Sequence, residues 1–263
     1  ASAPPIRQVA IGAGVSAFKI GGETVMFRHE KTFYNPTGIA ALVKSDMDGA
    51  ALDRKLKEWN AFQYERVGLN LRPELVALKD VNGNAAAFAA AAKKIAETSE
   101  FNLVLMTDKA DVMKAAVEGC AFKKPLLYAA TAQNAEAMGK LAKEKGLPLA
   151  VKADNLQNLI ALSDKLTGMG LKDLVLDSGA RDPKQVLQDQ VAIRRAPLKA
   201  GNRSLGFPTI AFPCEMAGNL DMETVLAAML IAKYAGIVVL SDFKGESLFP
   251  LLLERLNIYT DPQ

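Results

Sequence analysis

The chain is poor in the residue types that bind metal ions or cross-link a fold. Its 263 residues include only two cysteines, one histidine and one tryptophan. Cys120 and Cys214 lie far apart in the sequence, with no CxxC motif and no Cys/His cluster, so the sequence predicts neither a disulfide framework nor a metal site. Unpaired cysteines in such small number are typical of a reducing compartment, and we therefore expect a cytoplasmic protein.

Long apolar runs and a large excess of one charge are also lacking. No stretch reaches the ~18 consecutive apolar residues from which a membrane-spanning helix is inferred. The net charge of +3 is small, and the densest basic segment, residues 184–203, contains no aromatic residue. Nucleic-acid binding is typically marked by a stronger basic patch with aromatic side chains among it. We therefore expect neither a membrane nor a nucleic acid as a partner.

What the sequence does contain is a repeated pattern of eight short apolar runs, each followed by residues with helical spacing. The runs cover residues 24–28, 75–79, 103–107, 126–130, 149–153, 174–178, 209–213 and 237–241. Strand–helix alternation repeated eight times predicts an α/β fold, namely a (β/α)8 TIM barrel, for which ~250 residues are typical. We therefore expect residues 1–263 to form a single barrel domain, with its functional residues at the C-terminal ends of the strands.

A hairpin is predicted ahead of the barrel. Two apolar segments, residues 8–13 and 17–20, flank the turn sequence Gly14-Val15-Ser16, a pattern typical of a β-hairpin. In a barrel, a hairpin over residues 8–20 would close the N-terminal end of the strands.

Polar residues follow most of the predicted strands and would form a ring at the rim. The ring comprises His29, Glu30, Asp80, Thr107, Asp108, Thr131, Asp154, Asn155, Asp177, Ser178, Cys214, Glu215, Ser241 and Asp242. Carboxylates and hydroxyls in such a ring suit acid–base chemistry. Each of them also suits the capping of a helix or the solvation of a loop, which is the commoner role.

The ring contains no clear pair of nucleophile and base. His29 is the only histidine, and a structural role is the simpler interpretation for it. Lys79 and Lys152 lie near strand ends, where a Schiff-base aldolase holds its lysine, but lysines are common there. Cys214 would act as a nucleophile only beside a base, and the sequence places none there. We therefore expect no catalytic residue in this chain.

Two helical segments near the C-terminus are apolar on nearly all sides. Residues 222–235 are interrupted mainly by Glu223, Thr224 and Lys233, and residues 248–253 are entirely apolar. An outer barrel helix normally keeps a polar face. Either these segments are packed deeply within the barrel domain, or another domain or subunit covers them.

A resemblance to a known family rests on three segments: residues 22–33 (GETVMFRHEKTF), 208–213 (PTIAFP) and 257–262 (NIYTDP). Over essentially its whole length, the chain resembles the large (gamma) subunit of the corrinoid iron–sulfur protein of the acetyl-CoA decarbonylase/synthase (Wood–Ljungdahl) pathway. The resemblance implies three parts: a [4Fe-4S] module on four cysteines, a central TIM barrel and a C-terminal corrinoid-binding domain. This chain resembles the central barrel alone, and its proline-containing ends suggest connectors.

The resemblance further implies a methyl carrier that uses a corrinoid (cobalamin) and a [4Fe-4S] cluster, both held mainly outside the barrel. In this family the cobalt takes a methyl group from methyl-tetrahydropterin on a separate methyltransferase and passes it to acetyl-CoA synthase. The barrel would position or cap the corrinoid domain and bind the small subunit as a heterodimer. The rim facing the corrinoid domain would comprise Asp80, Thr107, Thr131, Asp177 and Glu215.

Two other functions stay open on the sequence alone. The first is a stand-alone TIM-barrel enzyme, either a pterin-dependent methyltransferase or a Schiff-base lyase, that uses Asp80, Asp177 or Lys152. The second is an assembly scaffold with no role near the cofactor.

Overall fold

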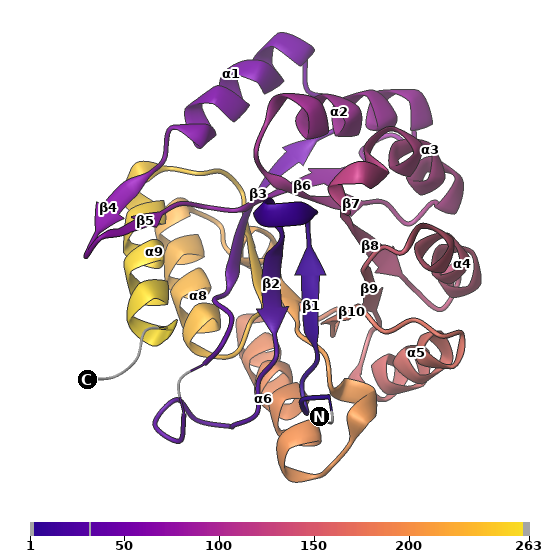
Figure 1. Ribbon diagram of the computed structural model, residues 1–263, viewed down its shortest axis with the longest axis vertical. Coiled ribbons are helices and arrows are strands. Elements are labelled where there is room, and N and C mark those ends of the chain that lie inside the picture. Colours follow the sequence, from indigo (N-terminus) through magenta and orange to yellow (C-terminus); the bar gives the residue numbers. More distant parts are fainter. Residues whose placement is uncertain (1–2, 32, 260–263) are drawn as a thin grey trace.

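The computed structural model describes residues 3–31 and 33–259, and its centre is a parallel β-barrel (Figure 1). The eight strands follow the sheet in the order β10, β9, β8, β7, β6, β3, β12, β11, and a bridge between Leu176 and Thr209 joins the two edges. The strands are β3 (Gly38–Lys44), β6 (Leu75–Lys79), β7 (Asn102–Met106), β8 (Leu126–Ala130), β9 (Leu149–Lys152), β10 (Leu174–Asp177), β11 (Ile210–Ala211) and β12 (Ile237–Leu240). The predicted (β/α)8 barrel is therefore confirmed.

Helices alternate with these strands and surround the sheet (Figure 1). They are α1 (Gly49–Asn60), α2 (Ala85–Thr98), α3 (Ala110–Cys120), α4 (Ala135–Lys145), α5 (Leu156–Gly168), α6 (Pro183–Lys199), the short α7 (Pro213–Met216), α8 (Leu220–Ala232) and α9 (Gly245–Tyr259). Several begin at a side chain that accepts hydrogen bonds from the first free amides. These N-caps are Asp48, Asn84, Asn155, Asp182 and Asn219. They fix where each strand–helix loop turns, and so help to shape the rim.

Alternate residues of each strand face two separate cores. One set points into the barrel, where the interior cluster includes Leu75, Ala77, Val104, Ala150, Val175 and Val239. The other set meets the helices, and this outer core contains the largest buried rings, Trp59, Phe88, Phe101 and Phe243. Because side chains alternate along a strand, Lys79, Lys152 and Asp177 share the inward side with the interior residues two positions before them.

The predicted N-terminal hairpin is also confirmed. Strands β1 (Gln8–Ile11) and β2 (Phe18–Gly21) pair antiparallel, and Val9, Ile11 and Ile20 are fully buried in the interior cluster. At the N-terminal end of β7, the Asn102 amide donates to the Ser16 carbonyl oxygen at 2.9 Å. The hairpin therefore covers the N-terminal end of the barrel, as Figure 1 shows. A second hairpin, β4 (Tyr64–Arg66) with β5 (Leu69–Leu71), follows α1 and is not predicted from the sequence.

The first predicted strand is wrong. Residues 24–28 form no strand: 24–25 are irregular and 26–28 form a bend and the start of a turn, and the first barrel strand is β3 instead. Long-range contacts determine this segment: Arg194 Nη2 donates to the Val25 carbonyl oxygen at 2.7 Å, and Arg28 Nε donates to that of Ile258 at 2.6 Å. These contacts hold the segment against α6 and α9 instead of beside a barrel strand, so local β propensity is overridden.

His29 and Glu30 consequently lie at the N-terminal end of the barrel, opposite the rim. Glu30 Oε1 is 3.9 Å from Nζ of Lys199 at the C-terminal end of α6. The ring of His29 stacks on that of Phe27, with centroids 5.6 Å apart. The prediction that His29 and Glu30 belong to the rim is therefore wrong.

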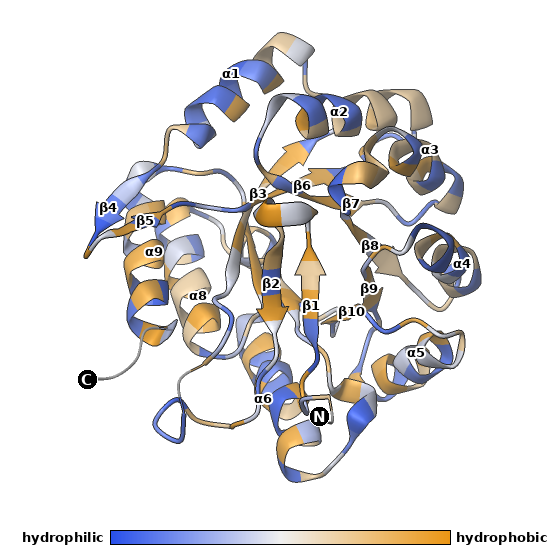
Figure 2. Cartoon of the chain, in the orientation of Figure 1, coloured by the Kyte–Doolittle hydropathy of each residue, from blue (hydrophilic) through white to orange (hydrophobic). Residues whose placement is uncertain are grey.

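The two apolar helical segments are packed mainly within this chain. Helix α8 buries Leu226, Ala227, Leu230 and Ile231, and α9 buries Leu248, Leu251 and Leu252. Apolar residues nevertheless extend to the outer side of both helices (Figure 2). Met222, Val225 and Phe249 are 50%, 61% and 37% exposed. Among the residues that the structure describes, no helix is both long and apolar enough to cross a membrane.

Candidate functional site

A cavity of about 910 Å³ opens at the C-terminal ends of the barrel strands. Its walls come from the ends of β6 to β9, the loops after β6 to β10, and helices α5 and α7. Four of the five predicted rim residues line it: Asp80, Thr107, Thr131 and Glu215. The fifth, Asp177, is buried at the end of β10 and bonds to Arg181, which does line the cavity. The fold thus brings the five predicted residues together at one place.

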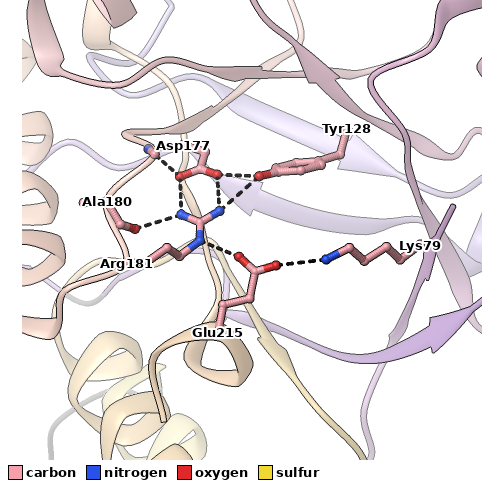
Figure 3. Close-up of polar contacts among 7 residues, drawn as sticks. Lys79, Tyr128, Asp177, Ala180, Arg181 and Glu215 are labelled. Carbon is pink, nitrogen blue, oxygen red and sulfur yellow. Dashed lines mark hydrogen bonds and ion pairs between the residues drawn. The ribbon is translucent and has the colours of Figure 1, made fainter. Parts of the chain in front are cut away.

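Arg181 is the centre of a hydrogen-bond network at this cavity (Figure 3). Its Nη1 and Nη2 atoms donate to Oδ1 and Oδ2 of Asp177 at 3.1 and 3.0 Å. Its Nε donates to Oε2 of Glu215 at 2.5 Å. The remaining donors reach the Ala180 carbonyl oxygen at 2.8 Å and the Tyr128 hydroxyl at 3.2 Å. Because a guanidinium has five N–H donors, every donor of Arg181 has an acceptor within this chain.

Asp177 and Tyr128 complete the buried part of the network. The Tyr128 hydroxyl donates to Asp177 Oδ2 at 2.5 Å, and the Gly179 amide donates to Oδ1 at 2.8 Å. Burial raises the pKa of Tyr128 well above its ordinary value, and the charge of Asp177 adds to the effect, so the phenol stays protonated and donates. The Phe212 ring packs against Tyr128 at a centroid distance of 5.0 Å and lies 4.6 Å from the Arg181 guanidinium.

Glu215 extends the network across the barrel mouth. Its Oε1 lies 3.4 Å from Nζ of Lys79 at the end of β6, while its Oε2 accepts from Arg181. Burial acts to raise the pKa of Glu215, but the hydrogen bonds and charges of Arg181 and Lys79 outweigh it and hold the pKa below its ordinary value. Burial likewise opposes the charge of Arg181, but its contacts with Asp177 prevail and raise its pKa. Glu215 is therefore ionised at neutral pH and pairs with both cations.

The other predicted rim residues hold the loops that surround the cavity. Thr107 Oγ1 donates to Asp80 Oδ2 at 2.9 Å, and the Gly83 amide donates to Asp80 Oδ1 at 2.8 Å. The Thr131 amide donates to Oδ1 of Asn134 at 2.7 Å. These contacts fix the loops after β6, β7 and β8, so the polar atoms at the rim are held in defined positions.

Further members of the predicted polar ring serve local structure. Asp154 accepts hydrogen bonds from the side-chain amides of Asn155 and Asn158 at 3.0 and 2.6 Å. Asp242 accepts from Nε1 of Trp59 at 2.8 Å, which ties the end of β12 to α1. For these acids, local side-chain contacts at the strand ends explain the residue type.

The candidate nucleophiles at the rim differ in their surroundings. Burial raises the pKa of the Cys214 thiol to about 12, with the charge of Glu215 adding to the effect, so the thiolate that would react is not formed at neutral pH. Lys79 is paired with Glu215. Lys152 lines the cavity with no hydrogen bond or ion pair to any residue that the structure describes. Within that same part of the chain, no group of three or more His, Cys, Asp or Glu residues is placed to hold a metal ion.

The sequence analysis does not single out Arg181 or Tyr128, although both are central to the network. Tyr128 is at an inward position of the predicted strand 126–130, and Arg181 follows the predicted strand 174–178. Both positions are therefore at the C-terminal rim of a barrel, which is the signal that could have identified them. Only the folded chain shows that both bond to the same carboxylate, that of Asp177.

Fold and site together define a class of protein: a TIM barrel with a polar cavity at its C-terminal rim, and an arginine in the cavity wall whose hydrogen-bond donors are all used. The chain belongs to the CO dehydrogenase/acetyl-CoA synthase delta subunit family, whose sequence model matches residues 8–263. This match and the relatives described next, which are large and gamma subunits, together confirm the resemblance carried by the three sequence segments.

Individual relatives agree with this assignment. The chain is 44% identical over 263 residues to the corrinoid/iron-sulfur protein large subunit of Moorella thermoacetica; the aligned region covers 100% of this chain and 58% of that protein. It is 36% identical over 274 residues to acetyl-CoA decarbonylase/synthase complex subunit gamma 1 of Methanosarcina mazei; the aligned region covers 99% of this chain and 58% of that protein. The chain thus spans 58% of the length of these curated relatives.

Solved structures share the barrel. The 7,8-dihydropteroate synthase from Vibrio fischeri matches with a TM-score of 0.64 and 14% identity, over 86% of this chain and 95% of that one. The phospho-2-dehydro-3-deoxyheptonate aldolase from Thermotoga maritima matches with a TM-score of 0.59 and 12% identity, over 91% of this chain and 70% of that one. At such low identities this likeness shows the fold alone.

Proposed function

We propose that this chain is the barrel part of a corrinoid methyl-carrier protein. The whole protein would receive a methyl group from methyl-tetrahydropterin through a separate methyltransferase and pass it to acetyl-CoA synthase. Family membership and the names of the two relatives support this pathway. Because the chain spans 58% of those relatives, the activity, cofactors and partners of a whole protein are part of the proposal.

The residues of this chain do not fit a [4Fe-4S] cluster, which is held by four cysteine thiolates. The chain has two cysteines, and burial raises the pKa of the thiols of Cys120 and Cys214 to about 12. The single histidine, His29, lies at the N-terminal end of the barrel, so the rim supplies no imidazole ligand for a corrinoid cobalt. We therefore assign the cluster and the main corrinoid-binding residues to parts of the protein outside this chain.

The observation that carries the proposal is that every N–H donor of Arg181 already has an acceptor within the chain. All the donors of Arg181 are used within the chain, so this side chain is fixed in the cavity wall and keeps no donor for a substrate. Such a fixed network suits a rigid platform on which another domain docks. On this proposal Asp177 holds Arg181 in place. The residues that face the corrinoid-bearing domain are Asp80, Thr107, Thr131 and Glu215.

The outer helices supply the second contact of the proposal. Met222, Val225 and Phe249 are the exposed apolar residues of α8 and α9, and we assign them to the interface with the small subunit. Exposed apolar side chains on neighbouring helices are favoured at protein interfaces because docking removes them from water.

The test is subunit association and methyl transfer in the full-length protein. Val225→Asp should weaken small-subunit binding at least about tenfold, because it buries a charge at an apolar contact. Phe122→Asp is the matched control, since Phe122 is 58% exposed in the turn before β8, on the other side of the barrel. Glu215→Gln should slow methyl transfer without loss of bound corrinoid.

Three results would contradict the proposal. Equal small-subunit affinity of the Val225→Asp and Phe122→Asp variants would show that Val225 does not lie in the interface. Turnover of methyl-tetrahydropterin by the 263-residue chain alone would favour a stand-alone methyltransferase. A borohydride-trapped adduct of a carbonyl substrate at Lys152 would favour a Schiff-base lyase.

A further inference from the structure

We propose that the rim cavity binds a small organic anion, with the charge of the ligand against Lys152 and its flat, apolar body on a floor of small side chains. This site requires neither a corrinoid nor a partner subunit, so it stands or fails independently of the proposed function. Two features carry it: a cation that nothing in the fold neutralises, and the shape and composition of the surface beside that cation.

Lys152 is the uncompensated cation. It ends β9, where it pairs in register with Asp177 of β10, and it is partly buried. Asp177 does not neutralise it, because both carboxylate oxygens of Asp177 bond to Arg181. Within the described residues, its ammonium forms no hydrogen bond and no ion pair. An ammonium that has lost part of its hydration without gaining an anion is poorly compensated, so an anionic ligand is favoured here.

The charges that line the cavity are distributed unevenly. Lys165 of α5 joins Lys152 on the β9 side of the cavity, and the one carboxylate of the lining on that side, Asp154, accepts hydrogen bonds from Asn155 and Asn158 and forms no ion pair with either lysine. The carboxylates of Asp80 and Asp108 belong to the loops after β6 and β7. The remaining cations of the lining, Lys79 and Arg181, are already paired with Glu215. A ligand anion is therefore directed to the β9–α5 side.

Small residues contribute to the cavity lining near the two lysines. Ala153 follows Lys152 directly, and Ala161 precedes Lys165 by four positions on α5. Ala129, Ala132 and Gly179 line the cavity from the ends of the neighbouring strands β8 and β10. Short side chains leave room for a flat ring and offer it apolar contact area. The volume of about 910 Å³ lies within the ~300–1,000 Å³ typical of small-molecule pockets. Charge and floor together specify a ring-bearing carboxylate or phosphate rather than a bare inorganic ion.

The test is an NMR titration of the 263-residue chain, labelled at alanine methyl groups, with benzoate at low ionic strength. We expect saturable shifts of the methyl signals of Ala129, Ala153 and Ala161. Benzamide, which has the ring without the charge, and inorganic phosphate, which has the charge without the ring, should each bind at least about tenfold more weakly, since each lacks one of the two contacts. Phosphate binding as tight as that of benzoate would overturn the assigned ligand class.

Variants locate the charge contact. Lys152→Met should weaken benzoate binding about tenfold, which is the size of one hydrogen bond to a charged group, and Lys152→Arg should restore it. Lys145→Met is the matched control, because Lys145 is exposed at the C-terminal end of α4, at the opposite end of the barrel. Unshifted alanine methyl signals, or wild-type affinity in the Lys152→Met variant, would overturn the proposal.

Discussion

Replacing Arg181 by methionine tests whether the rim network holds the barrel mouth together. The substitution removes all five donors and leaves Asp177, whose side chain is 3% exposed, with only Tyr128 and Gly179 as partners. Removing one member of a buried ion pair costs about 3–5 kcal/mol, because the other charge stays buried without compensation. The Arg181 side chain is 23% exposed, so we expect the lower end of that range, about 3 kcal/mol.

Guanidinium chloride unfolding measures this loss, with the fluorescence of the single tryptophan, Trp59 of the outer core, as the probe. A slope of roughly 5 kcal/mol/M is reasonable for a chain of this size, so a loss of about 3 kcal/mol lowers the midpoint by about 0.6 M. Arg195→Met is the matched control, because Arg195 is exposed on α6. It should change the free energy of unfolding by less than about 0.5 kcal/mol.

A double-mutant cycle with Asp177→Asn separates the pair from its surroundings. If Arg181 and Asp177 stabilise the fold through each other, the two single changes are not additive, and the coupling energy is at least about 1.5 kcal/mol. Coupling below about 0.5 kcal/mol, or equal midpoints for the Arg181→Met and Arg195→Met variants, would refute the reasoning.

Two more predictions concern the N-terminal end and the rim. Burial raises the pKa of Glu23 from 4.5 to about 6 against the opposing charge of Arg194, so the folded state holds this proton more tightly than the unfolded chain. The associated stabilisation, about 2 kcal/mol, is complete below pH 4.5 and lost as the pH rises through about 6. Unfolding midpoints measured between pH 4 and 7 should fall accordingly, and the Glu23→Gln variant should lack this pH dependence. Gly179→Ala should lower the free energy of unfolding by about 2 kcal/mol or more, because Gly179 has a φ of +76° and an added Cβ would lie 2.0 Å from the Ala153 carbonyl oxygen. Gly218→Ala, which meets no atom within 4 Å, is its control, and equal midpoints for the two variants would contradict the strain argument.

Seven of the eight barrel strands are predictable because their apolar runs are local signals. A strand buried on both sides must be apolar at nearly every position, as in β10 and β12, and the residues that follow it show helical spacing. The first strand is missed although β3, GIAALVK, is apolar at every position but the last, because its glycine and two alanines lower the β propensity. Residues 24–28 have the stronger local signal, but their contacts with Arg194 and α9 lie far away in the sequence.

At the rim, the residues are predictable but their pairing is not. The C-terminal ends of the strands identify Lys79 and Lys152 equally well as candidates, because each is a lysine at a strand end. The fold distinguishes them through contacts that local sequence does not encode: Glu215, 136 positions away, pairs with Lys79, whereas Asp177 beside Lys152 is committed to Arg181. The chemistry open to each lysine therefore depends on which carboxylate is already used, and a free cation arises at Lys152 because Arg181 occupies the neighbouring carboxylate.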